Sequence, residues 1–213
     1  MDRNSLLREL QDHRLVAVVR SKTADLAVQT AQACRDAGLK FIEITYSVPG
    51  AVDVIKNLTE VTDLHVGAGT VLSKQQAVAA IQAGAQFIVA PSLELELIPI
   101  CHEATIPCFP GAATPTEILA AIRAGADLVK IFPADLTGGP YFIRQMQGPF
   151  PEARFMVSGG VSLANVQEYV DVGTTGICLG SAYLGTLLAE KGRVGFIAEI
   201  AEFQKKVREA QAI

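Results

Sequence analysis

Short apolar runs alternate with amphipathic stretches along the chain. At four places a helical stretch ends in Ala-Gly or Val-Gly and an apolar run follows at once, as in DAGLKFIEIT and RAGADLVKIFPA. Glycine at such a position fits a left-handed helix C-cap, because it reaches positive φ without a Cβ clash. The four glycines are Gly38, Gly84, Gly125 and Gly173. The pattern therefore predicts four repeats of a helix, a tight turn and a strand.

Four further apolar runs lie between these repeats and complete a set of eight strands. They cover residues 15–20, 65–70, 106–111 and 154–160. The eight predicted strands begin near residues 15, 40, 65, 86, 106, 127, 154 and 175. The spacing of successive strands is enough for one strand, two short loops and one helix.

The stretches between the strands carry helix start signals. Thr114 precedes Pro115 and stands three residues before Glu117, which is the pattern of a capping box with proline at the first helical position. Ser73 and Ser162 are the predicted N-caps of two other helices.

Eight strands that alternate with helices predict a parallel sheet of the α/β class. Eight similar units most simply close as a single (β/α)8 TIM barrel, with residues 1–213 as one domain. An extra N-terminal helix, residues 2–12, is predicted to cover the barrel floor, and residues 193–210 are predicted as the eighth helix. An open, doubly wound sheet is the alternative architecture.

Composition narrows the class of protein. Half of the residues are hydrophobic and 19% are charged, which is typical of a globular chain with a large core. The net charge of −4, without a long basic run, argues against nucleic-acid binding. No uncharged apolar run approaches the length of a membrane span, and the N-terminus lacks the apolar segment of a signal peptide. We therefore expect a cytoplasmic protein.

The cysteines and histidines do not form a metal-binding pattern. Cys34, Cys101, Cys108 and Cys178 are scattered, without a Cys-x-x-Cys pair, and are expected to be buried thiols in a reducing compartment. The three histidines do not have metal-ligand spacing. We expect neither a metal nor another cofactor.

Strand alternation points a glutamate and a lysine into the barrel. In the second strand Ile42 and Ile44 suit the helix-facing side, which turns Glu43 inward, and the same reasoning turns Lys130 inward in the sixth strand. Both lie toward the C-terminal ends of their strands, where barrel enzymes keep their chemistry. The pair is either a structural ion pair or a neutral lysine nucleophile with a carboxylate that carries protons.

Glycines and serines gather where the last two strands end. The seventh strand ends in Ser158-Gly159-Gly160 and the eighth in Gly180-Ser181. Backbone N–H groups at glycine can approach a phosphate closely, and barrels often hold phosphate after these two strands. The alternative is that the glycines serve only tight turns. Two such pairs on neighbouring strands favour a phosphate site.

Seven motifs in a fixed order point to a family. They are IEIT (42–45), VGAGTV (66–71), Ala90-Pro91, PGAATPTE (110–117), VKIFPA (129–134), VSGGV (157–161) and LGSA (179–182). With them the chain resembles, over nearly its whole length, the bacterial 2-keto-3-deoxy-6-phosphogluconate (KDPG) aldolases, which often also cleave 4-hydroxy-2-oxoglutarate. These are metal-independent class I lyases of the (β/α)8 fold. The resemblance implies a homotrimer and a role in the Entner–Doudoroff pathway of carbohydrate metabolism.

The resemblance also implies a reaction and roles for single residues. KDPG would be cleaved to pyruvate and glyceraldehyde 3-phosphate, and 4-hydroxy-2-oxoglutarate to pyruvate and glyoxylate. Lys130 would form the Schiff base and Glu43 would move protons. Thr70 and Pro91 would line the pyruvate site, with Phe132 beside it. The phosphate-bearing end of the substrate would lie at Ser158, Gly159, Gly160, Gly180 and Ser181.

One position departs from the pattern of some family members. Where they carry an arginine that meets the pyruvate carboxylate, this chain has Ser47, which cannot provide a charged bidentate clamp. Arg20 ends the neighbouring strand and is predicted to supply the missing cation. Two alternatives stay open. One is 2-keto-3-deoxy-6-phosphogalactonate (KDPGal) aldolase, and the other is a non-aldolase phosphate-binding barrel, such as an isomerase or a binding protein.

Overall fold

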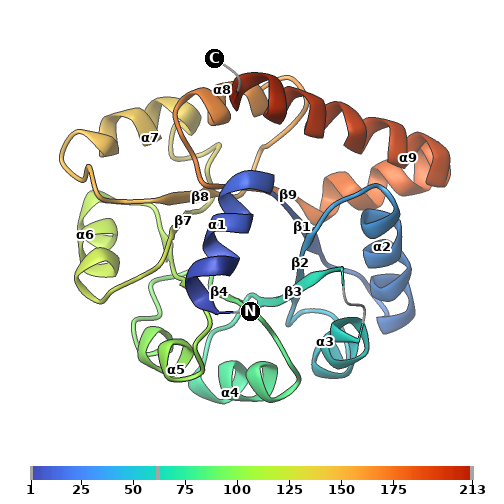
Figure 1. Cartoon of the computed structure of the whole chain (residues 1–213), viewed down its shortest axis with the longest axis horizontal. Coiled ribbons are helices and arrows are strands. Elements are labelled where there is room, and N and C mark those ends of the chain that lie inside the picture. The colour runs from blue at the N-terminus through green and yellow to red at the C-terminus, as the bar shows by residue number, and fades with distance from the viewer. Residues whose placement is uncertain (1, 61–62, 212–213) are drawn as a thin grey trace.

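The computed structural model describes residues 2–60 and 63–211, and its strands form a ring that helices surround (Figure 1). The strands are β1 (Leu15–Val19), β2 (Phe41–Thr45), β3 (His65–Gly69), β4 (Ile88–Val89), β5 (Cys108–Phe109), β6 (Gly111–Ala112), β7 (Val129–Ile131), β8 (Phe155–Val157) and β9 (Gly176–Leu179). The helices are α1 (Arg3–His13), α2 (Ala24–Asp36), α3 (Ala51–Thr59), α4 (Lys74–Gln82), α5 (Leu97–Glu103), α6 (Pro115–Arg123), α7 (Gly139–Gln147), α8 (Val166–Asp171) and α9 (Ser181–Gln211). The predicted α/β barrel with an extra N-terminal helix is confirmed.

The predicted fifth strand is present in two pieces, β5 and β6, on either side of Pro110. A proline has no amide hydrogen to donate. On both sides of it, however, hydrogen bonds reach the segment that contains β7. Asp127 N–H donates to the Cys108 carbonyl at 3.3 Å, and Lys130 N–H donates to the Pro110 carbonyl at 2.9 Å. β5 and β6 therefore act as one strand, in which β5 pairs with β4 and β6 pairs with β7. The sheet, with the strand order β5-β4-β3-β2-β1-β9-β8-β7-β6, thus closes into a barrel. The open-sheet alternative is wrong.

The local start and stop signals behave largely as predicted. The four repeat glycines all have positive φ, between 78° and 95°. Thr114 and Glu117 form the reciprocal hydrogen bonds of a capping box, and Ser73 caps α4. The caps set where these helices begin, and the glycines set where the chain leaves a helix for the next strand.

Two helix boundaries differ from the prediction. Ser162 does not cap a helix, because the Asn165 side chain closes a turn with the Ser162 N–H and the Gly160 carbonyl, and α8 begins only at Val166. The last helix, α9, already begins at Ser181, with one non-helical residue at Gly192 (φ 61°, ψ −176°). The predicted tail helix is therefore the second half of α9, and the sequence did not predict the first half.

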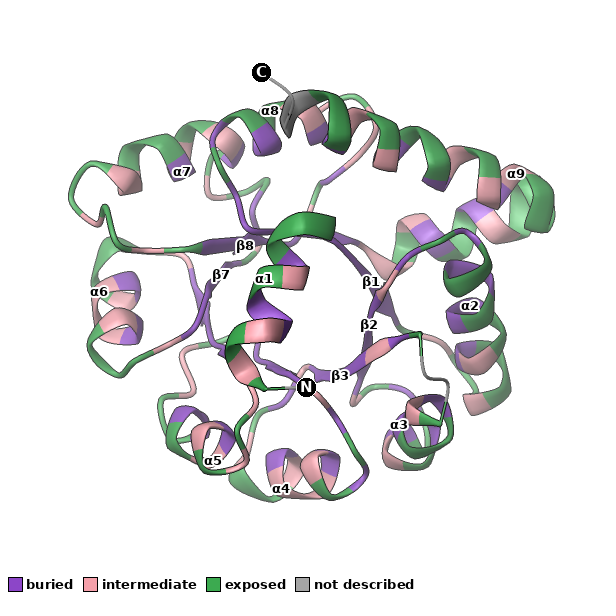
Figure 2. Ribbon diagram, viewed as in Figure 1, coloured by how far each residue is buried: buried purple, intermediate pink, exposed green. Residues whose placement is uncertain are grey.

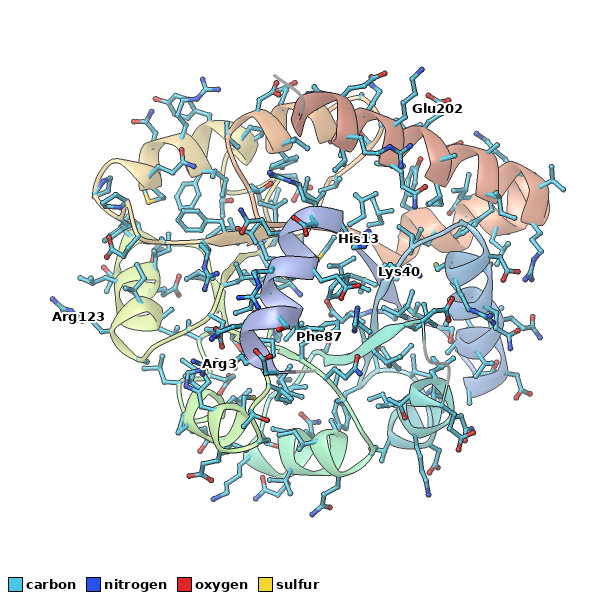
Figure 3. All side chains as sticks on the ribbon, in the orientation of Figure 1. Arg3, His13, Lys40, Phe87, Arg123 and Glu202 are labelled. Carbon is cyan, nitrogen blue, oxygen red and sulfur yellow. The ribbon has the colours of Figure 1, made fainter. Side chains whose placement is uncertain are left out.

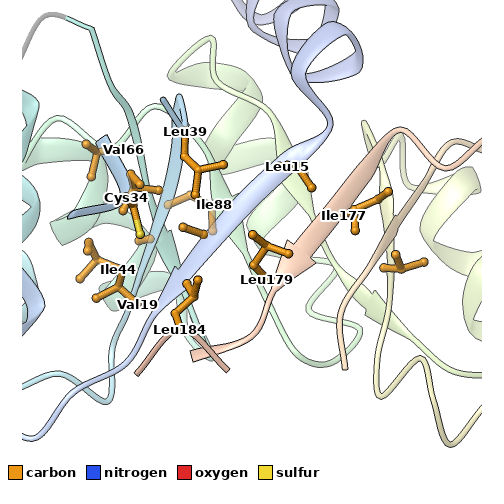
Figure 4. Packing of buried hydrophobic residues seen from close by; sticks show 14 of the residues in the cluster. Leu15, Val19, Cys34, Leu39, Ile44, Val66, Ile88, Ile177, Leu179 and Leu184 are labelled. Atoms are coloured by element: carbon orange, nitrogen blue, oxygen red, sulfur yellow. The ribbon is translucent and has the colours of Figure 1, made fainter. Parts of the chain in front are cut away.

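Buried apolar residues form two layers, one between strands and helices and one inside the barrel (Figure 2). In the outer layer, β-strand residues such as Ile44 and Leu179 pack with helix residues (Figure 4). The inner layer combines strand residues with three leucines of α1, which lies across one end of the ring with Phe87 close by (Figure 3). Its members are Leu6, Leu7, Leu10, Val16, Val18, Phe41, Phe87, Val89, Phe109, Leu128, Met156 and Cys178. This packing seals the N-terminal end of the barrel.

Within the described ranges, no helix combines the length and the hydropathy that a membrane-spanning segment requires.

Candidate active site

A cavity of about 730 Å³ lies at the C-terminal ends of the barrel strands, opposite the end that α1 covers. Every candidate residue from the sequence lines it. These residues are Arg20, Glu43, Thr70, Pro91, Lys130, Phe132, Ser158, Gly159, Gly160, Gly180 and Ser181. The structure thus brings the candidates to one place, while the role of each remains a prediction.

Lys130 and Glu43 form a buried pair in this cavity. Lys130 Nζ lies 3.8 Å from Glu43 Oε1, and the two side chains are 6% and 1% exposed. The other carboxylate oxygen, Glu43 Oε2, is buried and has no hydrogen-bond partner among the described residues. A buried acceptor without a partner costs about 1–3 kcal/mol, so a purely structural pair would be expected to satisfy both oxygens. The unsatisfied oxygen therefore favours a functional pair over a purely structural one.

Two glycines of the VGAGTV motif make room for the inward-facing side chains. Glu43 is paired with Gly67 in the β2–β3 register, and Gly69 lies two residues further along β3. A Cβ on Gly69 would overlap the Glu43 carboxylate, and a Cβ on Gly67 would overlap the Phe87 ring. Sequence reasoning did not identify Gly69 as part of the site, because the contact runs between two strands.

The surroundings of Lys130 limit which groups can react. Burial, and then the nearby Glu43 carboxylate, raise the pKa of the Cys178 thiol to about 12. The thiol therefore stays protonated at neutral pH and is a poor nucleophile that does not compete with Lys130.

An aromatic ring lies close to the Lys130 amine. Lys130 Nζ lies 5.3 Å from the centre of the Phe132 ring, a position that favours a positive charge on the nitrogen.

Arg20 is the other cationic side chain in the described lining of the cavity. Its Nη2 donates a hydrogen bond to Thr70 Oγ1 at 3.3 Å. Thr70 has φ +57°, a conformation that is rare for a β-branched residue and is often found at binding sites. Ser47 does not line the cavity, and its hydroxyl lies 2.8 Å from Thr45 Oγ1. A cation is thus available at Arg20 and not at position 47.

The part of the lining that Gly159, Gly160, Gly180 and Ser181 contribute is mostly backbone, with the Asp135 carboxylate packed behind Gly159 and Gly160. Gly159 and Gly160 have φ of 104° and 69°, which only glycine adopts readily. A Cβ on Gly180 would meet no atom within 4 Å. The next residue, Ser181, begins α9, whose first N–H groups have no partner within the helix. This end of the cavity can therefore hold an anion.

Some lining residues were missed by sequence reasoning. Val18, Val161 and Ala182 also line the cavity, but aliphatic side chains give no chemical signal in a sequence. The sequence places Tyr46 and Tyr183 near the mouth of the barrel, where either could contact substrate or only pack. Tyr183 lines the cavity and its hydroxyl donates to Glu199, whereas Tyr46 donates to the Gln76 carbonyl and does not line the cavity. The described residues contain no group of three or more His, Cys, Asp or Glu side chains arranged to hold a metal ion.

The family model that matches the chain describes aldolases, and aldolases are among the proteins with similar sequences and structures. The family model "Aldolase: KDPG and KHG aldolase" matches residues 6–200. The KHG/KDPG aldolase of Escherichia coli (strain K12) is 36% identical over 171 residues, which cover 80% of each chain. A solved structure described as "Native KDPGal structure" is similar with a TM-score of 0.83 at 32% identity, over 93% of this chain and 96% of that one. The KDPG aldolase of Legionella pneumophila, with pyruvate captured as a covalent carbinolamine intermediate, has a TM-score of 0.76 at 25% identity, over 94% of this chain and 95% of that one.

Proposed function

Because the chain belongs to the KDPG and KHG aldolase family and is therefore a lyase, we propose that it cleaves KDPG to pyruvate and glyceraldehyde 3-phosphate through a Schiff base on Lys130. Cleavage of 4-hydroxy-2-oxoglutarate to pyruvate and glyoxylate is the second reaction we propose. Family membership removes the alternative of a non-aldolase barrel. We also propose that residues 1–213 act as one barrel domain.

The buried pair of Lys130 and Glu43, 3.8 Å apart in the main cavity, is the observation that carries this proposal. An apolar layer below the pair keeps bulk water away from the Lys130 amine, which is the group that attacks the substrate carbonyl. The Glu43 carboxylate lines the same cavity and is the group proposed to accept a proton from a bound substrate.

The reaction needs an electron sink and a proton carrier, and the pair supplies both. The Lys130 amine adds to the C2 carbonyl of the substrate and loses water, which leaves a protonated imine. Glu43 takes the proton of the C4 hydroxyl, the C3–C4 bond breaks, and its electrons move into the imine to give an enamine and the free aldehyde. Glu43 then returns the proton to C3, and water releases pyruvate from Lys130. The Phe132 ring, 5.3 Å from Nζ, supports the cationic imine.

Arg20 is proposed to bind the pyruvate carboxylate, so Arg20→Ala should raise KM sharply. Two charge-assisted hydrogen bonds contribute about 2–4 kcal/mol, which corresponds to a loss of about 30-fold or more in kcat/KM. Adding Ser47→Arg to Arg20→Ala should restore part of the affinity. Lys22→Ala is the matched control, because Lys22 is exposed and does not line the cavity. Unchanged steady-state kinetics of Arg20→Ala would rule out this role.

KDPGal aldolase is the second candidate function, and it is favoured by the likeness to the structure described as native KDPGal. The two substrates differ in the configuration at C4, between the pyruvate end and the phosphate end. The deciding experiment measures aldehyde release from KDPG, KDPGal and the unphosphorylated sugar acid side by side. A preference for KDPG supports the first proposal, and a preference for KDPGal replaces it.

We propose that the protein is a homotrimer. Large apolar side chains are exposed in the segment after β7, where Leu136 is 82% and Tyr141 is 67% exposed, and such side chains are common in subunit contacts. Light scattering at micromolar concentration should therefore give three times the 22.6 kDa mass of one chain. A monomer under these conditions contradicts the proposal.

We also propose that the enzyme works in the cytoplasm, in the Entner–Doudoroff pathway. Its four cysteines are free and buried, which fits a reducing compartment.

A further inference from the structure

The last helix is bent back on itself. α9 has one non-helical residue, Gly192, and side chains from the helical segments before and after it are in contact. The ring of Tyr183 in the first half packs edge-on against the ring of Phe203 in the second half, with ring centres 5.6 Å apart. The two halves of α9 therefore lie side by side as a helical hairpin (Figure 1).

A carboxylate in the second half of α9 joins the two halves. The Tyr183 hydroxyl donates a hydrogen bond to one oxygen of Glu199, and the Lys191 ammonium donates to the other. We call Tyr183, Lys191 and Glu199 the α9 clasp. Hydrogen bonds from Lys191 and then from Tyr183 lower the pKa of the Glu199 carboxyl, so it stays ionised at neutral pH and keeps both donors. Because Lys191 offsets its charge, Glu199 does not repel an anion nearby.

The two halves of α9 differ in how firmly they are held. The second half buries four large side chains, each at most 2% exposed, and these are Phe196, Ile200, Phe203 and Val207. The first half buries Leu184 and Leu187, but glycines stand before, within and after it. A Cβ on any of these glycines, Gly180, Gly185 and Gly192, would meet no atom within 4 Å. Since glycine gives a helix more conformational freedom, the clasp ties the looser half to the firmer one.

The looser half begins at the end of the cavity that can hold an anion. The Leu184 N–H donates to the Gly180 carbonyl at 3.0 Å, which is the first bond of the helical pattern. The N–H groups of Ser181, Ala182 and Tyr183 precede that bond and have no partner within the helix. All three residues line the main cavity, as does Gly180. How well an anion binds there depends on how steadily these N–H groups point at it.

We propose that Glu199 is a positioning residue for the phosphate of the substrate, because through Tyr183 it fixes the first turn of α9. This inference rests on the proposed function. Glu199 lies outside the described lining of the cavity, so it acts through Tyr183 and not on the substrate itself. The chemistry at Lys130 does not use the first turn of α9. The clasp should therefore affect the binding of phosphorylated substrates and leave kcat unchanged.

Glu199→Ala should raise KM for whichever phosphorylated substrate the enzyme cleaves, KDPG or KDPGal. The rise should be about tenfold, the effect expected when a hydrogen bond to a charged group is lost, with kcat within about twofold of the native value. Pyruvate carries no phosphate, so the pyruvate concentration that half-saturates borohydride trapping should also stay within about twofold. Glu202→Ala is the matched control, because Glu202 is exposed in the same half of α9 and is not part of the clasp (Figure 3).

A second variant tests whether the effect passes through Tyr183. Tyr183→Phe removes the hydroxyl and keeps the ring that packs against Phe203. It should raise KM for the phosphorylated substrate as Glu199→Ala does. The double variant should be no worse than Glu199→Ala alone, because both changes break the same link.

The possible outcomes separate this inference from the proposed function. An unchanged or lowered KM in Glu199→Ala overturns the inference alone, and so does an equal loss of affinity for pyruvate, which would make the clasp a purely structural contact. A raised KM in Tyr183→Phe but not in Glu199→Ala would mean that the hydroxyl binds the substrate directly, and overturns the role of Glu199. An enzyme that forms no pyruvate imine, or that cleaves neither phosphorylated substrate, overturns the proposed function and this inference with it.

Discussion

Replacing Lys130 with methionine should abolish both turnover and the covalent capture of pyruvate. No imine can form without the amine, and the loss of a covalent nucleophile lowers turnover by factors on the order of 10⁴ or more. Borohydride added with pyruvate should inactivate the native enzyme and add one pyruvyl group per chain, on the peptide that contains Lys130. Lys130→Met should show no adduct. Lys40 is no substitute, because it lies with His13 in a separate pocket at the end of the barrel that α1 covers (Figure 3).

The control for this experiment must separate lost chemistry from lost stability. In Lys130→Met the Glu43 carboxylate, 1% exposed, loses its ion-pair partner, and breaking a buried pair commonly costs about 3–5 kcal/mol. Lys130→Met combined with Glu43→Gln removes both charges and should regain most of the melting temperature while it stays inactive. An enzyme that chelators inactivate, and that keeps its activity after borohydride with pyruvate, would be a metal-dependent lyase and not a class I aldolase.

Strand alternation in the sequence is enough to predict that Glu43 and Lys130 point into the barrel. A period of two is a rigid property of a strand, so the apolar residues beside Glu43 and Lys130 fixed the direction of both side chains. In the structure Ile42 and Val129 lie in the outer layer, and Glu43 and Lys130 line the cavity, as predicted. The repeated glycines predicted the helix ends for a similar reason, since each stands at the same place in its unit, where the backbone is left-handed and favours glycine.

The parts that the sequence did not predict depend on contacts between distant segments. Gly69 is required because the Glu43 carboxylate occupies the space of its Cβ, and this overlap exists only once β2 and β3 are paired. The hydrogen bond from Arg20 to Thr70 joins residues fifty positions apart. The first half of α9 was missed although its first residues line the cavity, because its glycine-containing sequence was not recognised as helical. Short-range patterns carry none of this information.

Replacing Glu43 with glutamine should separate imine formation from proton transfer. Glutamine keeps the size and shape of the side chain but cannot take up a proton as a general base, so turnover should fall by about 10²–10⁴-fold. The amine of Lys130 remains, and pyruvate should still be trapped there by borohydride. The exchange of the pyruvate methyl protons with deuterated water, followed by NMR, should slow by a similar factor. Asp53→Asn is the matched control, since Asp53 is exposed on α3 and lies outside the cavity.

This comparison tests the role of Glu43 more directly than an activity assay, because methyl exchange needs only pyruvate, Lys130 and the proton carrier. If Glu43 only paired with Lys130 to stabilise the barrel, Glu43→Gln would lower the melting temperature and leave the exchange rate per trapped imine unchanged. If Glu43 carries the proton, that rate falls even in the variant that remains fully folded. The position of Glu43 leads us to expect the second result, because its carboxylate lines the cavity with one oxygen 3.8 Å from Lys130 Nζ, close to where the imine would form.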